Sequence, residues 1–108
     1  PASSFNYSPK NVYSCTRFEF DASASSDPED PTSALEVRWD FDNNNIYETG
    51  WSKNKTITRV LGSPILDAPA LQTVRMQVAD TRGLVDTTTR LIEFKGVCAD
   101  NHLPLVYR

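Results

Sequence analysis

The feature that most constrains the fold of this chain is a period-two alternation of apolar and polar side chains. It is clearest over residues 35–41, where the apolar members are Leu35, Val37, Trp39 and Phe41. Side chains of a β-strand point alternately to opposite faces, so this segment predicts a half-buried strand. Apolar residues at the three-four spacing of an amphipathic helix are nearly absent over any useful window. The sequence therefore predicts an all-β fold.

The other segments with strand character are short and are separated by turn-forming residues. We expect strands over residues 4–7, 12–20, 55–60, 73–78 and 85–94, and loops over 21–33, 42–45 and 62–70. The last two strands are joined by a short turn that contains Gly83, and glycine tolerates the positive φ that hairpin turns need. Six or seven short strands with turns between them predict an immunoglobulin-like two-sheet β-sandwich of about seven strands.

The two tryptophans stand in different sequence contexts. Trp39 lies in the clearest alternating strand, so we expect it to fill the core between the two sheets. Trp51 follows a turn and Gly50, and two placements remain open for it. It could pack over the rim of the sandwich, or stand exposed and contact a ligand together with Tyr47.

Size and charge exclude several classes of partner. A chain of 108 residues fits one domain, and its 11 Lys and Arg against 14 Asp and Glu give a net charge of −3. No global positive field would hold a polyanion, so nucleic acid is not an expected partner.

No apolar run is long enough to span a bilayer, and we expect no membrane insertion. We expect a monomer. The start at Pro1 rather than Met suggests a piece of a longer protein.

The residues available for catalysis are few. The only histidine, His102, lies in a polar tail beyond the last expected strand, away from any serine or cysteine that it could activate. Asp40 and Asp42 share a strand face, as paired glycosidase carboxylates could, but acids on exposed strand faces are usually solvated. We expect no catalytic residues, no required cofactor and no enzymatic activity.

Four ordered stretches carry a family resemblance. They are Phe20–Asp27, Val37–Asp42, Thr73–Asp80 and Thr81–Gly83. In this order and spacing they resemble the polycystic kidney disease (PKD) domain family, with its serine-rich acidic turn, Trp-Asp-Phe strand and Val-x-Asp-x-x-Gly hairpin. The chain departs from the pattern after Phe41, where Asp42-Asn43-Asn44-Asn45 replaces the Gly-Asp-Gly of many members. The resemblance implies a PKD-type β-sandwich in residues 1–95 and a C-terminal tail, or the start of a linker, in 96–108.

The resemblance also implies a function and a location. PKD domains commonly accompany secreted hydrolases or surface proteins, so we expect an extracellular, non-catalytic accessory module. Such a module spaces neighbouring domains of its parent protein or interacts with another protein. One alternative is a module that binds polysaccharide or an insoluble substrate through Trp51 and Tyr47. Another is a calcium-stabilised adhesion module.

The two cysteines, Cys15 and Cys98, form no CxxC pair and offer no zinc knuckle. In a sandwich of this strand order, the second strand begins at the end where the last strand finishes. A disulfide between Cys15 and Cys98 is therefore expected, and it would imply an oxidising compartment. Two buried thiols are the alternative.

Two sets of acidic side chains are candidate calcium ligands. The loop over residues 21–33 and the final hairpin turn lie at the same end of the expected sandwich, which would bring Asp27, Glu29 and Asp30 towards Asp80. Calcium takes six to eight oxygen ligands in flexible geometry, and some PKD-like domains bind it through a similar acidic turn. A rival set is Asp40, Asp42 and Asn44. Alternatively, both sets are solvated acids that hydrogen-bond turn amides.

Overall fold

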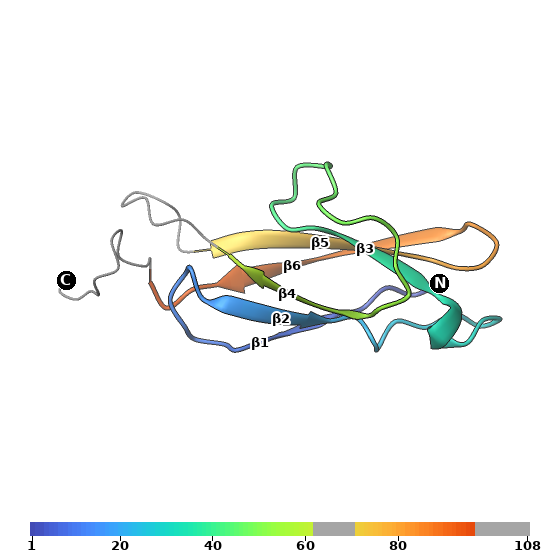
Figure 1. The fold of residues 1–108 in the computed structure, drawn as a ribbon, viewed down its shortest axis with the longest axis horizontal. Helices are drawn as coiled ribbons and strands as arrows, with labels where there is room; N and C mark the ends of the chain where they lie inside the picture. Colours follow the sequence, from blue (N-terminus) through green and yellow to red (C-terminus); the bar gives the residue numbers. More distant parts are fainter. Residues whose placement is uncertain (62–70, 97–108) are drawn as a thin grey trace.

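The computed structural model describes residues 1–61 and 71–96, which form two antiparallel three-stranded sheets packed face to face (Figure 1). One sheet has the strand order β1-β2-β4 and the other β3-β5-β6. The strands are β1 (Asn6–Ser8), β2 (Arg17–Asp21), β3 (Glu36–Asp40), β4 (Thr56–Val60), β5 (Leu71–Ala79) and β6 (Val85–Glu93). The predicted all-β sandwich is confirmed, with six strands in the described residues where about seven were expected.

The core forms because each sheet turns alternate side chains inward. Phe18 and Phe20 of β2 are buried while their neighbours are exposed, and β5 alternates buried residues with partly exposed ones. Trp39 is 2% exposed, and its ring centroid lies 5.1 Å from that of Phe5 and 5.6 Å from that of Phe20. Because Trp39 belongs to one sheet and Phe20 to the other, the indole joins the two layers. The expected core role of Trp39 is confirmed.

Strands β5 and β6 form a hairpin with nine paired positions, from Leu71 opposite Glu93 to Ala79 opposite Val85. Asp80 closes its turn, because one carboxylate oxygen accepts the N–H groups of Arg82 and Leu84, each at 2.9 Å. Gly83 has a φ of 88°, a conformation that favours glycine. The predicted hairpin is confirmed.

The strand expected over residues 12–20 is shorter than the alternation suggests. Asn11 and Cys15 have positive φ values of 60° and 67°, which interrupt an extended conformation. Residues 12–14 instead form backbone hydrogen bonds with the chain after β6. The Lys95 N–H donates to the Val12 carbonyl at 2.7 Å, and the Ser14 N–H donates to the Gly96 carbonyl at 3.0 Å. Strand β2 therefore begins only at Arg17.

The two ends of the described chain lie at opposite ends of the sandwich (Figure 1). Ala2 bridges to Ser26, and the Ser3 N–H donates to Asp86 at 2.8 Å, near the turn between β5 and β6. Residues 94–96 follow the far end of β6. The loop after β2 holds one short 3-10 turn, η1 (Thr32–Ala34). Over residues 1–61 and 71–96, no helix has the length and apolar character needed to cross a membrane.

Candidate functional site

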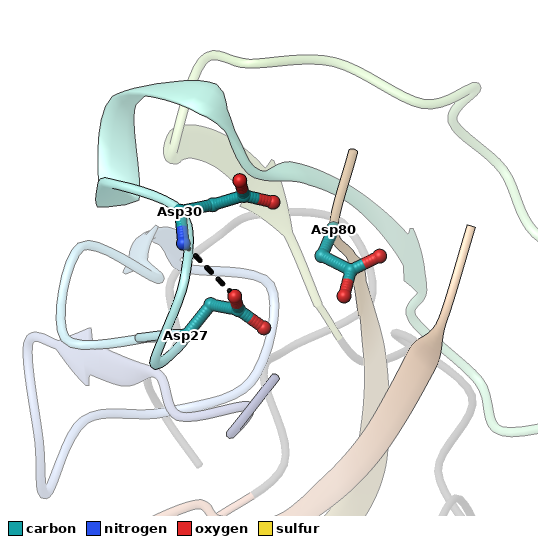
Figure 2. Close-up of side chains that lie close together, drawn as sticks. All are labelled: Asp27, Asp30 and Asp80. Carbon is teal, nitrogen blue, oxygen red and sulfur yellow. Dashed lines mark hydrogen bonds between the residues drawn. The ribbon is translucent and has the colours of Figure 1, made fainter. Parts of the chain in front are cut away.

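Three aspartates converge at the end of the sandwich that holds the N-terminus. Figure 2 shows Asp27 and Asp30 on the loop after β2, facing Asp80 from the β5–β6 turn. One carboxylate oxygen from each lies within 4.8 Å of the others. The loop folds back because Asp27 Oδ2 accepts the N–H of Glu29 at 2.9 Å and of Asp30 at 3.0 Å. The sandwich topology predicts this convergence, and we call these three residues the end cluster.

Glu29, predicted to join the three aspartates, lies outside the end cluster. Its Oε1 pairs with Arg82 Nη1 at 2.9 Å, and both side chains are more than half exposed. The tight turn that Asp27 stabilises points the side chains of consecutive residues in different directions. An exposed ion pair of this kind contributes little to stability.

The end-cluster carboxylates already take part in turn hydrogen bonds. The Glu29 N–H, together with the Pro1 ammonium at 3.1 Å, holds the pKa of Asp27 below its ordinary value. Asp30 Oδ2 accepts the N–H and the hydroxyl of Thr81, each at 2.9 Å. An all-oxygen donor set suits a hard cation such as Ca²⁺. The same hydrogen bonds would hold the turns without one, so calcium binding stays a prediction.

A second acidic group, which we call the β3 cluster, consists of Asp40, Asp42 and Glu48, with carboxylate oxygens within 4.8 Å of one another. Asp40 is buried and accepts the N–H groups of Asn44 at 3.2 Å and Asn45 at 2.7 Å. Partial desolvation raises the pKa of Asp42, which is otherwise exposed, and so do the nearby Asp40 carboxyl and the charge of Glu48.

The β3 cluster differs from the rival calcium set inferred from sequence. Asn44 donates its backbone N–H to Asp40 rather than standing as a third oxygen ligand. Glu48 is the third member of the β3 cluster instead, because its Oε1 accepts the Phe41 N–H at 2.6 Å as the chain returns from the turn. No spacing signal in the sequence points to Glu48, since the turn geometry alone brings it back to β3.

Tyr47 and Trp51 meet on a third site, which we call the aromatic surface, formed with Arg38. The guanidinium carbon of Arg38 lies 4.0 Å from the Tyr47 ring centroid and 4.7 Å from that of Trp51, within cation–π range. Trp51 is 38% exposed, whereas Tyr47 is half-buried and its hydroxyl is buried without a partner among the described residues. Of the two predicted ligand contacts, Trp51 presents the more accessible ring.

The aromatic surface stays at the sheet edge because the segment before β4 pairs with β3. Ser52 and Val37 exchange two backbone hydrogen bonds, at 2.8 and 3.0 Å. Ser52 is exposed and lines the edge of a small cavity beside the buried Val37, while Trp51 lies on the outer side with Arg38. A cavity of about 150 Å³ lies beneath this segment, smaller than the roughly 300–1,000 Å³ of typical ligand pockets. Any large ligand at this edge would bind on the surface.

Cys98 lies outside the described residues, so its predicted disulfide with Cys15 stays a prediction. The same holds for His102 and for the loop expected over 62–70.

Comparison with known proteins gives a structural likeness only. No family model matches the chain, and no curated protein matches it. A solved structure described as "Structural basis for the promiscuous specificity of the carbohydrate-binding modules from the beta-sandwich super family" is similar, with a TM-score of 0.68 and 27% sequence identity. The match covers 93% of this chain and 36% of that one, so this chain spans about a third of its length. The likeness supports the β-sandwich architecture described above.

Proposed function

We propose that this chain is a non-catalytic accessory module that binds polysaccharide at its aromatic surface. The observation that carries the proposal is Trp51, an indole 38% exposed at the sheet edge and held in place by Arg38. Tryptophan at such a position offers a flat apolar face and a polar N–H, which suits the alternating apolar and hydroxyl-bearing faces of a sugar.

The solved structure connected with carbohydrate-binding modules supports this proposal over a pure spacer. Only 36% of that chain is matched, so the likeness does not identify the part of it that holds carbohydrate. The binding site proposed here therefore rests on the aromatic surface of this chain.

The non-catalytic part of the proposal rests on the arrangement of the β3 cluster. A carboxylate oxygen of Asp40 lies within 4.8 Å of one of Asp42, whereas glycosidase carboxylates stand about 5 Å or more apart with the scissile bond between them. Asp40 is also buried and bound to the Asn44–Asn45 turn. A buried carboxylate held by two turn amides is not free to protonate or attack a glycosidic bond.

Membership of the PKD family remains part of the proposal. The motif residues that suggest it have structural roles in this chain: Phe20 and Trp39 pack in the core, and Asp80 closes the hairpin turn. These roles account for the motif without requiring any catalytic use. An extracellular location is proposed with the family.

A spacer between domains is the second candidate function. It is favoured by the placement of the described chain ends at opposite ends of the sandwich, which lets modules join end to end (Figure 1). A spacer needs no ligand, so a binding experiment separates the two candidates.

Affinity electrophoresis tests the proposal, with soluble polysaccharides cast in native gels. Hydroxyethylcellulose, galactomannan, xylan and alginate make a suitable panel. We expect at least one to retard the chain, and Trp51→Ala to remove the retardation. Tyr13→Ala is the matched control, because Tyr13 is 52% exposed but lies away from the aromatic surface. Normal migration of the parent chain in every gel would refute polysaccharide binding and leave the spacer function.

A further inference from the structure

A row of side chains crosses the outer face of the β3-β5-β6 sheet, starting from the aromatic surface. It consists of Trp51, Arg38, Gln77 and Thr87, which we call the outer row. In the strand register, Arg38 stands opposite Gln77, and Gln77 stands opposite Thr87. Their inward-facing neighbours, such as Val37 and Val78, are buried. The outer row therefore lies on the face turned away from the core.

Hydrogen bonds along the outer row have a fixed direction. Arg38 Nε donates to Gln77 Oε1 at 2.8 Å, and Gln77 Nε2 donates to Thr87 Oγ1 at 3.1 Å. A guanidinium has no acceptor, so the Gln77 amide must turn its oxygen towards Arg38 and its nitrogen towards Thr87. The Thr87 oxygen is then an acceptor, and its own hydroxyl proton can point to solvent, where the residue is exposed.

Arg38 anchors this chain of hydrogen bonds. Its guanidinium lies over the rings of Tyr47 and Trp51, and its Nε is committed to Gln77. Successive hydrogen bonds of the same direction polarise one another, which strengthens the last donor. An oriented donor therefore stands at one end of the outer row and an exposed indole at the other.

We propose that the outer row binds one uncharged polysaccharide chain lying across the strands. Trp51 would stack on one sugar ring, and the Thr87 hydroxyl would donate to an oxygen of another unit. Arg38 and Thr87 are separated by two strand spacings, about 10 Å, so the two contacts fall on different sugars of one chain. This inference rests on the proposed function and adds the ligand class and the specificity-determining residue Thr87.

The charges around the outer row favour an uncharged ligand. Arg38 is the single charged member of the row, and two ring faces cover it. Glu36 lies on the same face of β3, two residues from Arg38, and Arg75 on the same face of β5, two residues from Gln77. Arg75 is hydrogen-bonded to Asn43 and Asn45, so the row offers no cluster of free cations for an acidic polysaccharide, and the chain has a net charge of −3.

The test compares two isosteric substitutions on neighbouring positions of β6. Thr87→Val removes the terminal hydroxyl, whereas Thr89→Val removes an exposed hydroxyl that stands opposite Arg75, outside the outer row. In gels containing hydroxyethylcellulose or galactomannan, we expect Thr87→Val to weaken binding about tenfold and Thr89→Val to leave it unchanged. Gln77→Leu, which removes the positioning residue, should weaken binding as Thr87→Val does. Thermal melts of all variants check that the fold is retained.

Each outcome bears on a separate claim. If Thr87→Val binds polysaccharide as tightly as the parent while Trp51→Ala does not bind, the proposal that the ligand lies along the outer row is wrong. The proposed function would still stand. Retardation by alginate alone would overturn the uncharged ligand class. Absence of binding to the whole panel would remove the proposed function itself.

Discussion

Trp39 and Trp51 are the same residue type in opposite environments. Trp39 stacks on Phe41 with ring planes 5° apart and contacts Phe20 across the sandwich. Trp51 has the guanidinium of Arg38 over one ring face, and more than a third of its surface is exposed. The first indole therefore stabilises the fold, and the second leaves apolar surface for a ligand.

Substitution of each tryptophan should separate these roles. Trp39→Ala should lower the free energy of unfolding by about 3–5 kcal/mol, the usual cost of deleting a buried large aromatic residue. Trp51→Ala should cost less than half as much, because its ring is already partly hydrated. Urea unfolding of both variants measures the difference. Equal losses would mean that the Trp51 ring contributes to the core.

Asp42 is a residue at which removing a charge should stabilise the protein. Its folded-state pKa is raised, first by burial, so the folded state binds a proton more tightly than the unfolded state does. Above the unfolded-state pKa of about 3.9, ionised Asp42 therefore lowers the free energy of unfolding. This destabilisation is complete once the pH exceeds the raised folded-state pKa.

Asp42→Asn should consequently raise the melting temperature at pH 7 in the presence of EDTA. The gain should shrink as the pH falls through the raised folded-state pKa towards 4, because the folded-state carboxyl is then protonated and the unfolded one, with a pKa of about 3.9, is about half protonated. Melting curves of parent and variant at pH 4 and pH 7 provide the comparison. A variant that is less stable at pH 7 would show that the Asp42 carboxylate makes a net favourable contact.

At the scale of elements, the segment before β2 and the segment after β6 run side by side. The Lys95 and Ser14 N–H groups tie these segments together through two backbone hydrogen bonds. Cys15 directly follows the first segment, and Cys98 comes two residues after Gly96. This pairing supports the predicted disulfide, because it holds the chain near both cysteines at one end of the sandwich.

Intact mass before and after reduction should therefore show a gain of two hydrogen atoms for protein from an oxidising compartment. Reduction should also destabilise the fold, by up to about 4 kcal/mol on the chain-entropy model for a long closed loop. A melting temperature unaffected by reductant, together with two alkylatable thiols in the untreated protein, would contradict the disulfide.

For the whole molecule, the end cluster connects the loop after β2, the β5–β6 turn and the N-terminal segment. A cation held by Asp27, Asp30 and Asp80 would tie all three together in the folded state only. Such a ligand raises the free energy of unfolding by RT ln(1 + [Ca²⁺]/Kd), because the unfolded chain has no assembled site. The effect of calcium on global unfolding is therefore the relevant measurement.

Millimolar calcium should raise the thermal midpoint above its value in EDTA if the end cluster holds the ion. Asp27→Ala should then abolish the increase, whereas Asp42→Ala, in the β3 cluster, should preserve it. The reverse pattern would move the site to the β3 cluster. An identical midpoint in calcium and EDTA would leave both clusters as turn-forming acids.

What could be predicted from the sequence depended on local periodicity. Alternation over residues 35–41 identified β3 and buried Trp39, because the pleat of a strand sends alternate side chains to opposite faces. Gly83 between two alternating segments identified the β5–β6 hairpin for a similarly local reason. The strand expected from residue 12 began later, because the positive φ of Cys15 reflects contacts with distant residues such as Leu61.

By itself, then, the sequence determined the all-β class, most of the strands and the end at which acidic turns gather. Only the tertiary structure decided which side chains meet: Glu29 is left out of the end cluster, Glu48 rather than Asn44 lies beside Asp40, and the Arg38 guanidinium lies over the rings of Tyr47 and Trp51. Strand alternation follows from backbone geometry within a few residues. The direction of a side chain in a turn follows from hydrogen bonds to segments far away in the chain, and those exist only once the two sheets have packed.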